Sequence, residues 1–486
     1  MPLSEKLLSS WVRCRRKAWL DSFGNKKKRT WTAHTSLQLN HEKKSYSELT
    51  KGRSHRGLIS CAIGANWVIG AKLEVSDEQE RVLIAYPPLL EKVDGKSIWG
   101  SYAYRPVIAR QGKNINRIHR IKCGFYSYLL QKIQKGKVNN CLVVRKTDAI
   151  LEEENIIFNE KTEELFFQSL IKLEKDLKRN SPPPITSDRK KCALCSWKEF
   201  CNSEAEKEGH LSEISGIGSK RKLILQEIGI TNIKDLANFK PDDLENKLIK
   251  FGKQHEGIAY KIVEQAKSQK NKYSKKICNE PILPELQKAP GILIYDIESD
   301  PDLNNDFLHG FLAIRKKYNG NWDIKNAKYQ PLLNITRNEN KNNWHRIKSI
   351  LNKYKGWSII HFGETESSAI RKLALNAGQS KQEANKSIEN FIDLHQRIRN
   401  YWVLPVNSYG LKSIAKWIGF NWTQKNVDGS TAILWWRLWI DCNKKSKLNN
   451  LLIESIFTYN KDDCIATLQV VKWLLLQEEI SYNKFD

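Results

Sequence analysis

The sequence predicts an α/β protein of several domains. Its 486 residues are too many for one ordinary domain, so two or three hydrophobic cores are expected. Over residues 291–486, apolar strand-like runs alternate with helical stretches, which is typical of an α/β domain. Residues 1–204 also mix strand and helix patterns, whereas 205–277 are helical and basic. Residues 278–290 are expected to form a linker after an exposed, charged stretch.

The individual elements follow from hydrophobic period and from helix-ending or turn residues. In the N-terminal domain the pattern predicts helices over Ser4–Asp21, Arg117–Lys135 and Thr162–Arg179, and strands over Gly57–Glu74, Glu80–Leu90, Ile98–Arg110 and Val138–Arg145. In the C-terminal domain it predicts strands over Gly291–Tyr295, Leu308–Arg315 and Trp357–His361, and helices over Asn342–Lys355, Glu366–Asn376 and Ser455–Gln477.

The charge of the chain points to a polyanionic partner. With 81 Lys and Arg against 54 Asp and Glu, the net charge is +27, which favours nucleic acid first and an anionic membrane second. No apolar run reaches the ~18 residues of a transmembrane helix, and the start lacks a secretory signal. We therefore expect a cytoplasmic protein that does not act at a membrane, whose ten cysteines do not build a disulfide framework.

Two acidic motifs indicate a metal site. Asp296 and Glu298 end an apolar run at alternate positions, so on a strand both project from one face. Tyr459 and Asp463 are four residues apart, so on a helix they also share a face. Converging carboxylates are what two Mg²⁺ or Mn²⁺ ions need, which suggests metal-dependent phosphodiester chemistry.

Four cysteines have the spacing of a metal or cluster site. Cys192, Cys195 and Cys201 are spaced C-x2-C-x5-C, and Cys14 precedes them by about 180 residues. Four thiolates can hold a [4Fe–4S] cluster or a tetrahedral Zn²⁺. The remaining cysteines show no ligand spacing and are expected to be small buried residues: Cys61, Cys123, Cys141, Cys278, Cys442 and Cys464.

One distant cysteine followed by a local group of three resembles the RecB-like nucleases that carry an iron–sulfur cluster. The resemblance implies a restriction-endonuclease-type α/β domain over 1–204, with the cluster joining its two ends. The family's P-D-(D/E)-x-K acids are missing, because Pro88 stands where Asp is expected and Tyr102–Arg110 contains no acid. Lys122 also replaces the Gln of the family's Q-x-x-x-Y motif. We therefore expect a degenerate nuclease centre, with migrated ligands at Glu74, Glu91 or Asp94 as the alternative.

The segment after the cysteines resembles a helix–hairpin–helix motif. Gly216 and Gly218 supply the tight turn, and Lys220, Arg221 and Lys222 add positive charge. Backbone amides at such a turn and at the next helix N-terminus face a phosphate in a sequence-independent manner. The resemblance implies DNA binding, and a turn used only for packing is the alternative.

The C-terminal domain resembles the ribonuclease-H-like, DnaQ-type 3′–5′ exonucleases. The resemblance assigns Asp296, Glu298 and Asp463 as metal ligands and Tyr459 as the group that orients the attacking water. We expect the fourth carboxylate after Trp357–His361, at Glu366 rather than Glu364. Its competitor is Asp393, which similar domains use structurally.

Lys412, between Glu366 and Tyr459 in the sequence, is a candidate phosphate contact. The simpler expectation is that its side chain is solvated on a helix face.

The whole chain resembles a bacterial RecB-like nuclease family with a fused ribonuclease-H-like domain. The resemblance implies a metal-dependent nuclease, a 3′–5′ exonuclease using two Mg²⁺ or Mn²⁺ ions, with DNA favoured as substrate and RNA possible. The alternative is a catalytically inactive nucleic-acid-binding scaffold that an iron–sulfur cluster stabilises.

Overall fold

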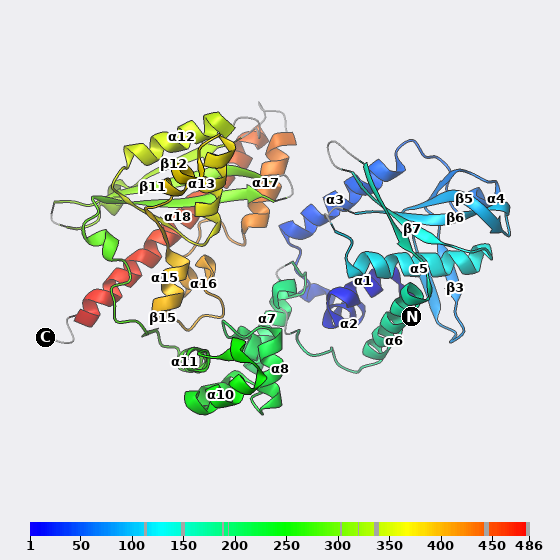
Figure 1. Ribbon diagram of the computed structural model, residues 1–486, viewed down its shortest axis with the longest axis horizontal. Coiled ribbons are helices and arrows are strands. Elements are labelled where there is room, and N and C mark those ends of the chain that lie inside the picture. Colours follow the sequence, from blue (N-terminus) through cyan, green and yellow to red (C-terminus); the bar gives the residue numbers. More distant parts are fainter. Residues whose placement is uncertain are drawn as a thin grey trace. The chain divides into compact units, whose positions relative to one another are not determined.

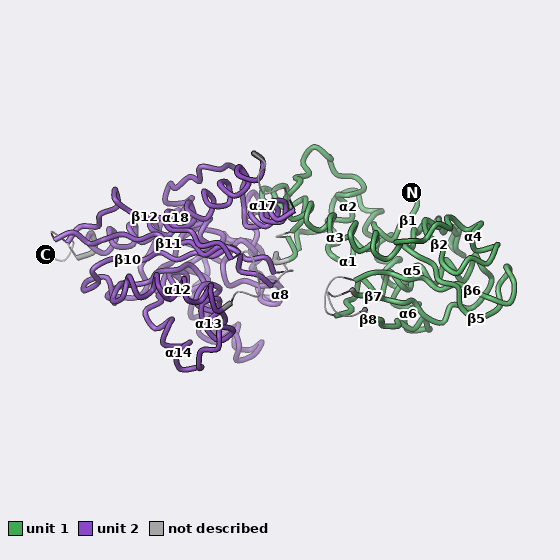
Figure 2. Tube along the Cα trace, turned by 90° about the horizontal axis from the view of Figure 1, so that it is seen from above, with its two compact units in different colours: residues 1–205 green, residues 206–486 purple. Residues whose placement is uncertain are grey.

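The protein combines helices and β-sheets throughout. The computed structural model describes residues 1–110, 114–146, 151–186, 189–192, 194–301, 304–318, 320–334, 340–441 and 447–482, so Cys442 lies outside the described residues. The chain divides into two compact units, Met1–Ala205 and Glu206–Asp486 (Figures 1 and 2). Among the described residues, no helix is both long enough and apolar enough to cross a lipid bilayer.

Unit 1 has two sheets and a helical layer. Its elements in order are β1 (Leu3–Ser4), α1 (Glu5–Arg13), α2 (Arg15–Phe23), η1 (Lys26–Lys28), α3 (Ala33–Thr50), α4 (Ile59–Ala62), β2 (Trp67–Ile69), β3 (Leu73–Ser76), β4 (Val82–Ala85), β5 (Leu89–Ser97), β6 (Gly100–Ala109), α5 (Arg117–Gln134), β7 (Asn140–Lys146), β8 (Leu151–Ile157), α6 (Glu160–Leu177), η2 (Arg189–Cys192) and α7 (Lys198–Glu208), whose end already belongs to unit 2. The larger sheet has the order β2-β5-β6-β7-β8, and the smaller one has the order β1-β4-β3.

The core of unit 1 lies between these sheets and helices α1, α5 and α6. The interior face of α5 contributes Phe125 and Leu129, which pack with Phe166 of α6 and with strand residues such as Leu90. Only β6 and β7 pair in parallel within the larger sheet, and its other neighbours are antiparallel.

Three predictions for unit 1 need correction, and one of them is the single strand expected over Glu80–Leu90, which is instead β4 and the start of β5 in separate sheets. The helix expected over Ser4–Asp21 is two helices, because Cys14 between α1 and α2 adopts an extended conformation with φ −161° and ψ 122°. The strand expected over Gly57–Glu74 is instead a short helix, α4, followed by strands β2 and β3. Turns at Gly64 and Gly70, both with positive φ, interrupt the apolar run there.

Unit 2 begins with a small helical bundle. Its elements are η3 (Leu211–Glu213), α8 (Ser219–Glu227), α9 (Ile233–Asn238), α10 (Pro241–Leu248), η4 (Ile249–Phe251), η5 (Lys253–His255) and α11 (Ala259–Asn271). Their apolar faces meet in one core that includes Leu225, Leu236, Leu244 and Val263.

The segment expected to be an exposed linker is instead packed. Strand β9 (Lys275–Lys276) pairs with β15 (Trp402–Val403), and Ile282 is fully buried in the core of the C-terminal domain. The carboxylate of Glu478 accepts hydrogen bonds from the Ile282 N–H at 2.8 Å and from Lys276 Nζ at 3.0 Å.

The C-terminal domain is a five-stranded sheet between helices. After η6 (Pro284–Gln287), its elements are β10 (Gly291–Asp300), β11 (Asn305–Arg315), η7 (Ile324–Asn326), β12 (Lys328–Leu333), α12 (Asn340–Lys353), β13 (Ser358–His361), α13 (Thr365–Asn376), α14 (Lys381–Lys386), β14 (Phe391–Asp393), α15 (Leu394–Tyr401), β15, α16 (Leu411–Trp417), α17 (Gly429–Asp441) and α18 (Lys447–Tyr482). The strand order is β12-β11-β10-β13-β14. β10, β13 and β14 pair in parallel, whereas β11 pairs antiparallel with both β10 and β12.

Side chains of the central strand alternate between two cores, and this alternation positions the site. Ile292 and Ile294 pack on one face with residues of α18, whereas Leu293 and Tyr295 pack on the other face with α12 and α13. Successive side chains of a strand point to opposite faces. The even-numbered continuation of β10 therefore faces α18, which crosses the sheet in Figure 1.

Candidate active site

The acidic pair on β10 lies where the sequence pattern predicted. β10 continues through Asp296 and Glu298 to Asp300, so both carboxylates stand on the face that Ile292 and Ile294 cover further back. Asp296 is half-buried and Glu298 is buried. The register with β11 shifts between Glu298 and Ser299, and this irregularity follows directly after the second acid.

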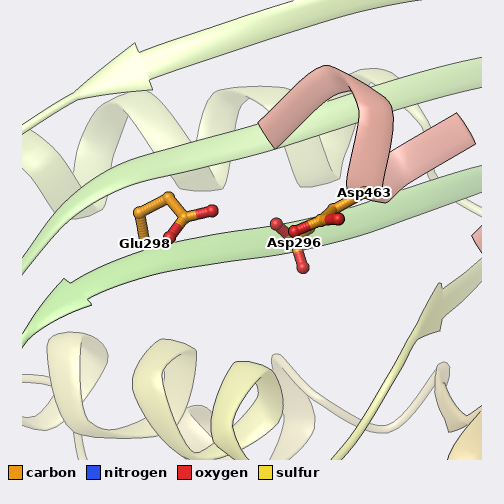
Figure 3. Close-up of side chains that lie close together, drawn as sticks. All are labelled: Asp296, Glu298 and Asp463. Atoms are coloured by element: carbon orange, nitrogen blue, oxygen red, sulfur yellow. The ribbon is translucent and has the colours of Figure 1, made fainter. Parts of the chain in front are cut away.

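Helix α18 brings the third carboxylate to the pair. Asp463 and Tyr459 occupy one face of the helix, and Tyr459 lowers the pKa of Asp463. One ligand oxygen from each of Asp296, Glu298 and Asp463 lies within 4.8 Å of the other two, and Figure 3 shows these three side chains. In the described part of the chain this is the one cluster of three such ligands.

Two side chains that the sequence did not single out hold these acids. Trp422, in the loop after α16, donates its indole N–H to Asp463 Oδ1 at 2.6 Å. Asn460 donates from Nδ2 to Asp296 Oδ2 at 2.6 Å. Both residues lie far in sequence from Asp296 and Glu298. The only sequence feature that pointed to either of them was the position of Asn460 directly after Tyr459.

Burial and mutual repulsion disfavour the charged forms of the three acids. Burial, then the charges of Asp463, Glu298 and Glu366, raises the pKa of Asp296 well above its usual range. The same causes raise the pKa of Glu298, against opposing contributions from Asn460 and Lys412. Burial raises the pKa of Asp463 to about 6, although Trp422, Lys412 and Tyr459 favour its ionised form.

These properties fit a divalent metal ion. Hard cations such as Mg²⁺ take oxygen ligands, and three carboxylate oxygens converge here without a protein cation bonded to them. A bound cation would remove the repulsion that raises their pKa values. The donor set therefore matches Mg²⁺ or Mn²⁺ rather than a thiolate-seeking metal.

Glu366 lies nearby but outside the three-acid cluster. It is buried in the first turn of α13, its Oε2 has no hydrogen-bond partner among the described residues, and His361 Nδ1 is 3.7 Å away. Its charge contributes to the raised pKa values of Asp296 and Glu298. Glu366 is therefore close enough to act on the cluster and has a free oxygen for a cation.

The competing acids have other positions. Asp393 Oδ1 accepts hydrogen bonds from the Gly363 N–H at 3.1 Å and from the Gln396 N–H at 3.2 Å, so it fixes the turn after β13 and caps α15. Glu364 is exposed on the rim of the groove described next. The preference for Glu366 over Glu364 therefore stays a prediction.

An open groove of about 670 Å³ leads to the acids. Its wall includes Asp296, Asp463, Tyr459, Lys412, Phe362 and His395. Lys412 does not simply point to solvent. Its Nζ lies 4.8 Å from the ring centre of Tyr459 and donates a hydrogen bond to the Val427 carbonyl. The groove thus presents one cation beside a cluster of acids, an arrangement that suits a phosphate held by metal ions.

One of the comparisons with known proteins, the family-model match, agrees with this geometry. Residues 293–475 match the sequence model of a family described as the RNase_H superfamily. They form a ribonuclease-H-like domain. Six chains of solved structures match, among them "Crystal structure of SSO0001", with 14% identity, a TM-score of 0.27, and coverage of 42% of this chain and 86% of that one. No curated protein matches.

Members of this superfamily generally hydrolyse phosphodiesters. The matched range contains all the acids of the candidate site and the tyrosine beside them. The ribonuclease-H-like domain therefore has a nuclease-like fold.

The predicted hairpin glycines lie in the turn before α8, and the three basic residues lie in the first turn of that helix. Gly216 has φ +93°, a conformation that favours glycine, whereas a Cβ on Gly218 would meet no atom within 4 Å. Lys220 is exposed. Arg221 donates from Nη1 to the Gly216 carbonyl. Lys222 is buried with its Nζ 2.6 Å from His210 Nε2, so it holds the turn together and does not reach the surface.

Helix α11 joins this bundle to the wall of the groove. Gln265 Nε2 donates to the Leu404 carbonyl at 2.6 Å, and Gln269 Nε2 donates to the Val406 carbonyl at 2.8 Å. Gln269 also donates to the carbonyl of Glu213, three residues before Gly216, at 2.8 Å. The loop held in this way continues into Ser408 and Lys412 of the groove wall.

The four predicted cluster cysteines all lie in unit 1. All are half-buried and none forms a disulfide. Burial raises the pKa of the Cys201 thiol, with smaller contributions from Cys195 and Cys14, and the Cys195 N–H donates to the Cys192 carbonyl at 3.0 Å. Three of the thiols are therefore within electrostatic range of one another.

Proposed function

We propose that this protein is a metal-dependent nuclease whose ribonuclease-H-like domain hydrolyses nucleic acid, with 3′–5′ exonuclease action on DNA as the specific activity. The observation that carries the proposal is the convergence of Asp296, Glu298 and Asp463 within 4.8 Å at the end of an open groove. Buried like charges are retained where a cation or a reaction requires them.

The proposed site residues have distinct roles. Asp296, Glu298, Asp463 and Glu366 would hold two Mg²⁺ or Mn²⁺ ions, which supply a water of lowered pKa and stabilise the leaving oxygen. Tyr459 is buried against Asp463, and burial raises the pKa of its hydroxyl, so it stays protonated and can orient a water molecule by a hydrogen bond. Lys412 neutralises a phosphate oxygen that enters the groove.

The helical bundle supplies a second contact with the substrate backbone. The first turn of α8 leaves backbone N–H groups without intrahelical partners, and the exposed Lys220 stands beside them. Through Gln265 and Gln269 the bundle is hydrogen-bonded to the loop that continues into the groove wall. We assign the phosphate contact to Gly216, Gly218 and Lys220, and leave Arg221 and Lys222 to hold the turn.

Unit 1 is proposed to be a degenerate RecB-like domain that binds nucleic acid. Among its described residues no three acidic, histidine or cysteine ligands converge as in the C-terminal domain. Its four cysteines Cys14, Cys192, Cys195 and Cys201 are proposed to hold a [4Fe–4S] cluster, with Zn²⁺ as the alternative, because four thiolates can ligate either group. An anaerobic absorption spectrum with iron analysis tests this assignment.

The decisive experiment compares the wild type with Asp296→Ala/Asp463→Ala on end-labelled single-stranded DNA and RNA. We expect Mg²⁺- or Mn²⁺-dependent shortening from the 3′ end by the wild type and no cleavage by the double variant. Binding of the same strand in EDTA should be equal for both proteins. Absence of wild-type cleavage with every metal and substrate would overturn the nuclease and favour the binding scaffold.

A further inference from the structure

Asn460, beside the tyrosine of the site, has an unusual set of contacts for a helix residue. Its side chain is fully buried in α18, and helices seldom bury an amide without a specific partner. Nδ2 donates to Asp296 Oδ2 at 2.6 Å, and the same side chain lowers the pKa of Glu298. The amide therefore acts on both acids of β10.

The other end of the amide is fixed by the edge of the sheet. The hydroxyl of Tyr329, on β12, donates to Asn460 Oδ1 at 2.8 Å. An ionised carboxylate can only accept, so Nδ2 faces Asp296, and the Tyr329 hydroxyl, which can donate or accept, donates to the remaining Oδ1. Two strands thus cooperate, since Tyr329 on β12 orients an amide of α18 that holds an acid on β10.

The strand between them is shaped to admit the amide. Gly310, on β11, pairs with Asp296, and a Cβ placed there would lie 1.7 Å from Asn460 Oδ1. Such a distance is impossible for real atoms, and the φ of Gly310 is not in the left-handed region. The glycine is therefore required for space and not for backbone conformation.

We infer that Asn460, held by Tyr329 above Gly310, is a positioning residue that orients Asp296 and Glu298 for a divalent cation. The inference rests on the proposed function and adds residues to it. A neutral donor occupies one oxygen of Asp296 and leaves the other for metal, and it adds no charge to the cluster. Groups that orient metal ligands in this way typically change metal affinity or activity 10–100-fold when removed.

Three single variants perturb the arrangement from different sides. Asn460→Leu keeps the approximate volume and removes both hydrogen-bonding ends. Tyr329→Phe removes only the hydroxyl that fixes the amide. Gly310→Ala displaces the amide oxygen by steric contact. The control is Asn449→Leu, a buried asparagine of the same helix that donates to the Trp439 carbonyl at 3.0 Å, away from the acids.

The first readout is the Mg²⁺ concentration at the midpoint of the increase in melting temperature, measured without substrate. The second is the Mg²⁺ concentration that gives half-maximal cleavage. For the three variants we expect both to rise about 10–100-fold, with cleavage at saturating Mn²⁺ restored to within several-fold. For the control we expect lower stability and an unchanged midpoint.

A midpoint within twofold of the wild type in both Asn460→Leu and Tyr329→Phe would overturn the inference while leaving the nuclease intact. If Asn460→Leu does not fold, Tyr329→Phe carries the decision, because it removes one oxygen atom only. A wild type that neither binds Mg²⁺ nor cleaves would instead overturn the proposed function itself, so the two failures are distinguishable.

Discussion

Neutralising Asp463 should stabilise the metal-free protein while destroying its response to metal. Asp463 has an ordinary pKa of 3.8 that the fold raises to about 6. A shift of about 2 units corresponds to roughly 3 kcal/mol between the two protonation states. At pH 8 the Asp463 carboxylate is ionised in the folded and in the unfolded protein. The buried charge therefore lowers the stability of the folded wild type by this full amount. Asp463→Asn carries no charge and escapes it.

Proton linkage determines how the stability of the wild type changes with pH. The folded state binds more protons than the unfolded state between pH ~4 and ~6, so the stability of the wild type falls as pH rises through that window. Asn has one oxygen instead of two, so we subtract about 1 kcal/mol for a hydrogen bond lost from Trp422 or Tyr459. The net gain at pH 8 is about 2 kcal/mol, or roughly 4–8 °C in melting temperature.

The assay is calorimetry of the intact chain in EDTA at pH 8 and at pH 4.5. Because the protein has two units, the relevant transition is the one that Mg²⁺ raises in the wild type. We expect Asp463→Asn to melt higher at pH 8, to show no advantage at pH 4.5, and to gain little from Mg²⁺.

The neighbouring residue Asp462 provides the matched control. Its Oδ2 accepts hydrogen bonds from the Thr423 N–H at 2.8 Å and from Thr423 Oγ1 at 2.6 Å. Asp462→Asn should therefore lower stability by about 1–2 kcal/mol. An Asp463→Asn protein that melts below the wild type at pH 8, or whose advantage persists at pH 4.5, would refute the electrostatic reasoning.

Three other variants test separate parts of the molecule. Tyr459→Phe should reduce kcat about 10²-fold in single-turnover cleavage with an unchanged Mg²⁺ midpoint, and a shifted midpoint would contradict its role in orienting water. Lys412→Met should weaken single-strand binding in Ca²⁺ and reduce its salt dependence by about one phosphate contact, and an unchanged salt slope would contradict a phosphate contact. In unit 1, Asp176→Asn leaves Arg15 and Trp11 with a weaker acceptor and should destabilise that unit by about 2–4 kcal/mol without changing Mg²⁺-dependent melting of the C-terminal domain, as differential scanning calorimetry would show.

The part of the site that sequence could predict is the part that obeys a local period. Asp296 and Glu298 share a strand face, and Tyr459 and Asp463 share a helix face, so each pair followed from spacing alone. The mixed α/β organisation was predicted for the same reason. Trp422 escaped notice because it lies in a loop with no period, and its partner Asp463 is 41 residues away.

Other misses have equally physical causes. The break between α1 and α2 has no Gly or Pro to mark it, and Cys14 itself takes the extended conformation there. The burial of Lys222 depends on His210, which precedes the turn and carries no motif signal. The packed course of Lys275–Ile282 depends on Glu478 near the end of α18, about 200 residues further on.

Compensation of charge, and not burial, separates structural from candidate functional acids in this protein. Asp300 is fully buried on β10, four residues after Asp296, and Arg437 pairs with both of its oxygens at 2.7 Å. Burial alone would raise the pKa of Asp176, yet hydrogen bonds from Arg15 and Trp11 outweigh it and hold that pKa below its usual value. Buried acids with only a structural role are expected to be paired with arginine or other donors, as Asp300 and Asp176 are.

The acids of the candidate site receive only partial compensation. Asn460 and Trp422 are neutral donors, and Lys412 acts on the cluster without bonding to it. Each donor orients an oxygen and none cancels a charge, so the cluster keeps its attraction for cations and its cost to stability. Natural folds retain such a cost where function requires it. The uncancelled charge of Asp296, Glu298 and Asp463 is therefore the strongest physical argument that this site binds metal ions.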